Sequence, residues 1–189
     1  MKKTLSISML CFLFLTCTFD YGDLGDSDRT LPDLVMKNVE YVRVRSADPL
    51  ARVQAERVER FESQGYMRLE TFSFEQFGER GEEVNAFGRV GFATVDISSA
   101  DVFMDRGVRI EVESEDFIIE TNQLNWIDEQ RLLSAGEESE VSVFQGNGTT
   151  FTGTGFRADA RRRSWEFSGN VRGTYVHEDD DAEDTDDAE

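Results

Sequence analysis

The sequence has few of the residues on which nucleophilic enzymes and disulfide-bonded proteins depend. Of 189 residues only two are cysteines, Cys11 and Cys17, and the single histidine is His177. The chain after residue 17 therefore has no thiol nucleophile and no disulfide, and it has no histidine-assisted acyl transfer within its body. A glycosidase with two carboxylates stays open on residue types alone. We predict no catalytic residue, no cofactor and no metal site.

Proline and long apolar runs are also scarce. The two prolines, Pro32 and Pro49, come early, so nothing interrupts a backbone hydrogen-bond ladder from Leu50 onward. The apolar run 5–19 follows two lysines and is shorter than the roughly 20 residues that cross a bilayer. This combination is typical of an export signal.

The end of the apolar run indicates how the chain is anchored. Cys17 closes the stretch "LFLTC", as in a bacterial lipoprotein signal, where the cysteine becomes the acylated N-terminus. Thr16 is bulkier than the residue usually found before such a cysteine, so an uncleaved short anchor and plain secretion stay open. Each outcome places the body outside the cytoplasm. We predict a signal or lipoprotein-type anchor at 1–17 and a flexible tether at 18–32.

Charge excludes one class of partner. The formal net charge is −19, and nine of the last twelve residues are acidic. A chain of this sign is a poor ligand for nucleic acid, because phosphate binding needs basic side chains. We predict a disordered acidic tail at 177–189 and one folded domain at 33–176.

Alternating apolar positions dominate the body of the chain and predict an all-β, antiparallel fold. Short runs with this period occur at Val42/Val44, Phe72/Phe74, Ala93/Val95/Ile97, Val108/Ile110/Val112 and Val141/Val143. Glycine, aspartate, asparagine or serine flanks each run, as expected for turns. We therefore expect strands that each bury one face.

Two segments need a decision between helix and strand. In "IIETNQLNWIDEQRLL", Ile118–Leu133, Leu124 and Trp126 alternate and "DEQ" suits a turn, so we predict a strand, a turn and a second strand. In "ARVQAERVERFESQG", Ala51–Gly65, a helical spacing and an alternating one fit equally well. A helix and a strand both remain open there.

The second half of the chain carries a family resemblance in the order of its strands. Gly91–Gly173 has a "V-x-I" strand, an apolar strand into "T-x-x-L-x-W", a "V-x-V" strand, "F-x-G-x-G-F-x-x-D" and a final "W-x-F-x-G-x-V". The ordered set resembles LptC, the membrane-anchored periplasmic component of lipopolysaccharide export. The segment from Pro32 to Gly88 matches more loosely, and the acidic tail is not part of the family pattern.

The resemblance implies a twisted, V-shaped antiparallel β-jellyroll that receives acyl chains between its two sheets. It implies a periplasmic bridge, anchored to the inner membrane, that accepts lipopolysaccharide or a related glycolipid from the permeases of an ABC transporter. The bridge then passes the glycolipid to an LptA-like jellyroll protein. Such a protein binds, orients and releases its cargo and is not an enzyme.

The resemblance also selects candidate site residues. The lipid-binding groove is predicted from the apolar members of the alternating strands in the best-matched region, which are Val95, Ile97, Phe117, Ile119, Leu124, Trp126, Val143, Phe156 and Phe167. The last strand is predicted to be an open edge that docks the next jellyroll, through Asn170, Val171, Arg172, Gly173, Thr174, Tyr175 and Val176. Cys17 is the predicted lipid anchor.

A second function class competes with the bridge. A structural or adhesion lipoprotein with a closed β-sandwich core would have the same strand pattern and the same signal. The two differ in whether apolar side chains leave room for a lipid between the sheets.

Overall fold

The structure, a computed structural model, describes residues 31–78 and 81–177. The predicted signal at 1–17, nearly all of the predicted tether and the tail from residue 178 lie outside these residues. In the described ranges no helix is both long enough and apolar enough to cross a membrane. The regular elements there are β-strands and two short 3-10 turns, η3 (Glu62–Gln64) and η4 (Glu113–Glu115).

Five long strands form the first part of the sheet and eight short ones the second. The long strands are β1 (Leu34–Arg45), β2 (Asp48–Phe61), β3 (Tyr66–Phe77), β4 (Val84–Asp96) and β5 (Val102–Val112). The short strands are β6 (Phe117–Thr121), β7 (Leu124–Ile127), β8 (Leu132–Ser134), β9 (Glu140–Gln145), β10 (Thr150–Thr154), β11 (Arg157–Asp159), β12 (Ser164–Glu166) and β13 (Gly169–Thr174).

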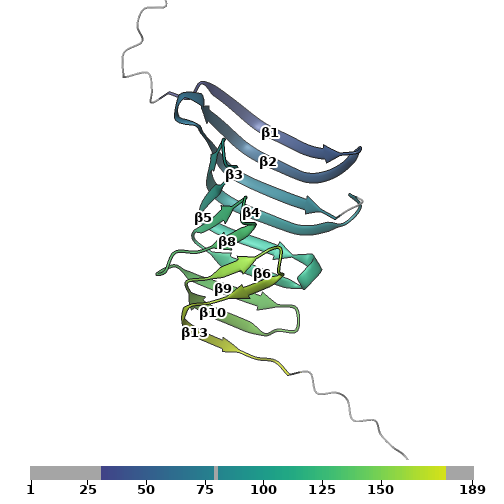
Figure 1. The fold of residues 1–189 in the computed structure, drawn as a ribbon, viewed down its shortest axis with the longest axis vertical. Helices are drawn as coiled ribbons and strands as arrows, with labels where there is room; N and C mark the ends of the chain where they lie inside the picture. The colour runs from purple at the N-terminus through teal and green to yellow at the C-terminus, as the bar shows by residue number, and fades with distance from the viewer. Residues whose placement is uncertain (1–30, 79–80, 178–189) are drawn as a thin grey trace, which may run out of the picture. The chain divides into compact units, whose positions relative to one another are not determined.

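All thirteen strands belong to one antiparallel sheet that divides at β5. The main path runs β1-β2-β3-β4-β5-β6-β9-β10-β13, and Figure 1 shows these strands stacked in nearly chain order. The first half of β5 pairs instead with β7, which continues through β8 and β11 to β12. We call β6-β9-β10-β13 the first branch and β7-β8-β11-β12 the second branch.

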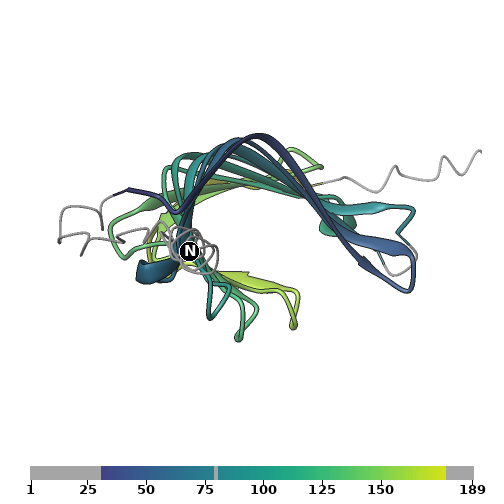
Figure 2. The same ribbon diagram turned by 90° about the horizontal axis from the view of Figure 1, so that it is seen from above.

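A line of bends crosses the long strands at mid-length and turns the sheet into a jellyroll. Asn38 in β1, Thr71 in β3 and Arg106 in β5 have left-handed backbone angles, with φ of 51°, 46° and 63°. The register places Thr71 opposite Gly91 of β4, and Gly91 lies beside Arg106. Figure 2 shows the strands curving through this line. Non-glycine residues rarely adopt such angles, so sheet pairing on both sides holds the bends in place.

The bends change the spacing of the residues that face inward. Within a straight strand inward residues are two apart, but across the bend Ala55 and Val58 are three apart and both are buried. The same three-residue step separates Leu69 from Phe72 and Val90 from Ala93. One face of each long strand therefore stays inward on both sides of the line.

The structure shows the secondary structure of the two segments for which the sequence allowed both a helix and strands. Ala51–Gly65 is the strand β2 followed by η3, not a helix. Ile118–Leu133 contains the predicted strand, a turn at residues 128–131 and a second strand. It also contains a break at residues 122–123 that was not predicted, where the chain leaves the first branch and enters the second.

One expected buried pair is wrong. Val42 and Val44 are 41% and 60% exposed, whereas the other alternating runs contribute to the core. Val42 pairs with Arg52, whose guanidinium binds Glu75 on the outer face at 2.8 Å. The residues of β1 that pack against the core are instead Met36 and Val39, on either side of the bend at residue 38.

Candidate functional site: the interior face of the sheet

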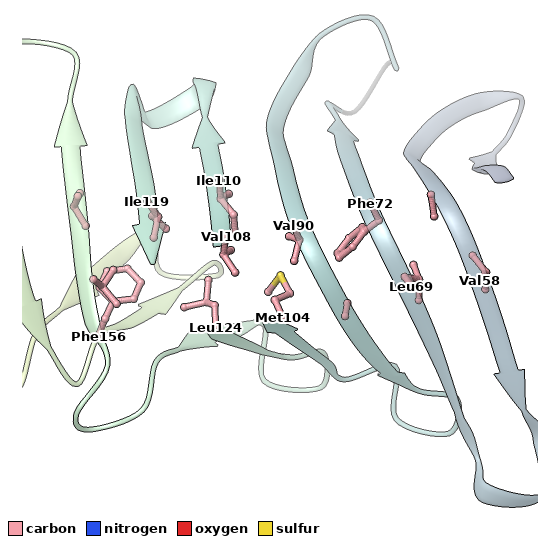
Figure 3. Close-up of a cluster of buried hydrophobic side chains, with 14 residues drawn as sticks. Val58, Leu69, Phe72, Val90, Met104, Val108, Ile110, Ile119, Leu124 and Phe156 are labelled. Carbon is pink, nitrogen blue, oxygen red and sulfur yellow. The ribbon is translucent and has the colours of Figure 1, made fainter. Parts of the chain in front are cut away.

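The inward residues of neighbouring strands line up in rows that run the length of the sheet. One row passes from Met36 through Val58, Leu69, Ala93 and Met104 to Leu124 in the second branch. Another passes from Tyr41 through Val53, Phe74, Gly88, Ile110, Ile119 and Val143 to Phe151 in the first branch. Figure 3 shows members of these rows on one side of successive strands. The interior is therefore a continuous apolar strip that runs from β1 into both branches.

Eight of the nine residues predicted to line a groove lie on this interior. Ile119, Leu124, Val143 and Phe156 are fully buried, and Val95, Phe117, Trp126 and Phe167 are partly buried against them. Ile97 lies elsewhere, because it follows the end of β4 and is 39% exposed. Its backbone N–H donates to the carbonyl oxygen of Gly65 at 2.9 Å.

The predicted groove residues omit most of the interior contributed by the first four strands, although Phe72 and Ala93 were already placed in alternating strands. These buried residues are Ala55, Val58, Leu69, Phe72, Val90 and Ala93. They fall mostly in the loosely matched segment, so the resemblance did not select them. The signal that could have found them is the three-residue step at each bend, which resembles a helical spacing when it is read without its flanking alternation.

Along the row that begins at Tyr41, exposure is high at β1 and low where the row enters the first branch. Tyr41 in β1 is 60% exposed, Val53 and Phe74 are partly buried, and Ile110 is 3% exposed. Ile119 and Val143 are fully buried. The interior is therefore open to solvent at β1 and closed where the two branches face each other.

Aromatic rings close the interior at the branched end. Phe151 of β10 in the first branch and Trp165 of β12 in the second have ring centroids 5.6 Å apart. Phe167 is 5.7 Å from Trp165 in an edge-on arrangement and 5.3 Å from Phe156. Such tilted contacts are the favourable geometry for aromatic pairs.

Most of the charge lies on the outer face and in the turns, whereas Arg60, which pairs with the inward Met67, lies at the edge of the interior. Thr149 is the one polar residue fully buried in the described part of the chain. On the outer face the guanidinium of Arg109 donates to the carboxylates of Glu111 and Glu120, and its hydrogen bond to Glu111 is the main reason that the pKa of Arg109 is raised. The interior can therefore bind hydrocarbon, while the paired charges keep the opposite face in water.

Of two open depressions in the described structure, one lies apart from the predicted groove and the other, about 140 Å³, includes only Phe117 of the nine predicted residues. The first, about 750 Å³, lies at the bends of β3 to β6 and is lined by Phe72, Val90 and Val108 as well as by the polar side chains of Arg89, Arg109 and Glu120. None of the nine predicted residues borders it. Within residues 31–78 and 81–177, no three histidine, cysteine or acidic side chains are grouped to hold a metal ion.

Comparisons with known proteins agree with this geometry. The chain matches the family described as lipopolysaccharide-assembly, LptC-related, over residues 6–176. No curated protein matches it. A crystal structure of LptH from Pseudomonas aeruginosa, the LptA-homologous periplasmic component of the lipopolysaccharide transport device, is similar in fold with a TM-score of 0.52. The two are 14% identical, and the match covers 67% of this chain and 95% of LptH. Because the family match spans nearly the whole chain, the protein belongs to the LptC-related family of lipopolysaccharide-assembly proteins.

Proposed function

We propose that this chain receives the acyl chains of lipopolysaccharide, or of a related glycolipid, on the interior strip and passes them to a second jellyroll protein. The observation that carries the proposal is the apolar strip itself, which is open at β1 and contains no fully buried charge. The donor would be the permeases of an inner-membrane ABC transporter. The acceptor would be a periplasmic LptA-like jellyroll.

The physical basis is transfer of hydrocarbon from water to an apolar surface. Each buried CH₂ contributes about 0.8 kcal/mol, so an acyl chain gains several kcal/mol from even partial insertion. Half-exposed residues such as Val53 and Phe74 gain as well, because the lipid covers apolar surface that water now contacts. Binding and release need no catalytic group, and the energy for transport would come from the transporter.

Site-specific photo-crosslinking tests the side of the sheet that binds lipid. Trp126 pairs with Val102 and Leu133 on the interior, whereas its neighbour Asn125 pairs with Phe103 on the outer face. We expect a photoreactive residue at Trp126 to capture glycolipid in cells and one at Asn125 to capture little. Immunoblotting of the captured adduct with an antibody to lipopolysaccharide measures both. Equal capture from the two positions would contradict binding on the interior.

The predicted docking segment Asn170–Val176 forms the last strand of the main path and its extension. In the described structure β13 pairs with β10 alone. The backbone N–H of Val176 donates to the Oγ1 of Thr149 at 3.0 Å, so it points back toward β10. Backbone N–H groups alternate in direction along a strand, so those of Val171, Gly173 and Tyr175 point away from the domain. These groups are the donors that a neighbouring strand would use.

A proline at one of these outward positions tests the docking edge. Tyr175→Pro removes an outward donor and places a ring on the free side of this edge just after β13, and Val176 keeps its hydrogen bond to Thr149. We expect binding to a purified LptA-like jellyroll to fall about tenfold, because backbone hydrogen bonds contribute roughly 1 kcal/mol each and the ring adds a clash. Titration calorimetry measures the affinity.

Tyr175→Ala is the matched control for this substitution, because it removes the same side chain and keeps the donor. If the proline and alanine variants bind the jellyroll equally well, β13 is not the docking strand. Anchoring through Cys17 also remains a proposal, and this residue lies outside the described part of the chain.

A further inference from the structure

The two branches meet at the tips of their turns as well as through their rings. In the first branch, η4 joins β5 to β6 and carries Glu113, Glu115 and Asp116 at its tip. In the second branch, the turn between β11 and β12 carries Arg161, Arg162 and Arg163. An acidic tip on one branch thus accompanies a basic tip on the other.

One ion pair crosses between the tips. The Nε of Arg163 lies 3.5 Å from the Oε1 of Glu115. The other two arginines have partners on their own branch, since Arg161 donates to the carbonyl oxygen of Glu129 at 2.7 Å and Arg162 lies 3.5 Å from the carboxylate of Asp159. Arg163 is therefore the member of the triplet that joins the branches.

The turn that presents Arg163 is itself held by hydrogen bonds. The Oδ1 of Asp159 accepts the backbone N–H groups of Arg161 at 2.9 Å and Arg162 at 3.0 Å. These bonds, that of Arg162 first, lower the pKa of Asp159, so the carboxylate stays ionised. Arg163 follows in a left-handed conformation with φ of 53°, and β12 begins at the next residue.

The ion pair and the ring contact connect the same two branches. Trp165 lies two residues after Arg163, and its ring contacts Phe151 of the first branch. Phe156 is fully buried beside them. An acyl chain that moves from the open end of the strip toward β13 must therefore separate Phe151 from Trp165.

We infer that Glu115 and Arg163 form a clasp that holds the two branches together over the closed end of the interior, and that an acyl chain reaches this end only when the clasp opens. An exposed ion pair shifts an equilibrium by no more than about fivefold. The clasp is thus weak enough for an inserting lipid to open and strong enough to favour the closed state without lipid. The identity of the bound group as an acyl chain rests on the proposed function. The contact between the branches through Glu115 and Arg163 does not.

The test measures the separation of the tips by pulsed electron paramagnetic resonance. The full chain carries Cys11→Ser and Cys17→Ser, with nitroxide labels at Ser114→Cys and Ala160→Cys, two uncharged exposed positions on opposite tips. Glu115→Arg and Arg163→Glu are each expected to raise the population of long distances about threefold to tenfold, since attraction becomes repulsion. The double exchange should restore the original distribution to within about twofold. Raising the salt concentration should also open the unmodified clasp.

The outcomes separate the clasp from the proposed function. Distances that do not change on either single reversal, or that the double exchange does not restore, would overturn the clasp. Adding purified lipopolysaccharide to the labelled protein should lengthen the distances. If lipopolysaccharide has no effect while the reversals behave as expected, the clasp stands and the proposed cargo is wrong. If only lipopolysaccharide lengthens them, the cargo stands and the clasp is wrong.

Discussion

Replacing Phe156 by alanine is expected to lower the free energy of unfolding by about 3–5 kcal/mol. Phe156 is fully buried between the end of β10 and the start of β11, where the chain passes from the first branch to the second. Its ring contacts Phe167 and Trp165 at 5.3 Å and 6.5 Å. Alanine would remove these contacts and leave a cavity where the chain passes from one branch to the other.

Denaturation in urea, followed by tryptophan fluorescence, measures this loss because Trp165 is part of the cluster. Phe103→Ala is the control, since Phe103 is 39% exposed and its removal should change the free energy of unfolding by about 1 kcal/mol or less. A similar small change for Phe156→Ala would mean that the branches do not depend on this ring for their packing.

Gly91→Ala is expected to destabilise the fold by about 1–3 kcal/mol through overpacking at the line of bends. A Cβ at Gly91 would overlap the carbonyl oxygen of Arg106, which belongs to the backbone and cannot rotate away. The register between β4 and β5 shifts at this point, and Arg106 is left-handed there. The substitution therefore acts on the geometry that turns the sheet into a jellyroll.

Alanine substitutions at two other glycines provide comparisons for the loss of stability in the same urea experiment. A Cβ at Gly88 would meet the ring of Phe74, a side chain that can move, so Gly88→Ala should be milder than Gly91→Ala. Gly136→Ala meets only the side chain of Ser139, within a turn, and should be nearly neutral. An order in which Gly91→Ala is the mildest of the three would contradict the close approach at the bend.

Much of the fold was predictable because alternation marks most of the strands that bury one face. Val108, Ile110 and Val141 were assigned to strands from this pattern and are buried, and the predicted all-β jellyroll is confirmed. Family membership confirms a place in periplasmic lipopolysaccharide transport and a non-enzymatic role. The donor, the acceptor and the lipid-contacting residues remain predictions.

The bends and the branching were not predictable from alternation. A bend changes the inward spacing from two residues to three, as between Ala55 and Val58 of β2, and the segment Ala51–Gly65 therefore fitted a helix as well as a strand. The change of branch at residues 122–123 depends on which half of β5 each strand pairs with, and that pairing is a tertiary choice. The clasp depends on Glu115 and Arg163, which are far apart in sequence and carry no local signal.

The nearly sequential strand order also has a consequence for how the chain folds. From β1 to β6 each strand pairs with its neighbour in sequence, so these hairpins close short loops with little loss of chain entropy. The pairings β6-β9, β8-β11 and β10-β13 join more distant segments and form more slowly. We therefore expect the rate-limiting step of folding to be the assembly of the two branches, with the hairpins of the long strands already formed as a template for β6 and β7.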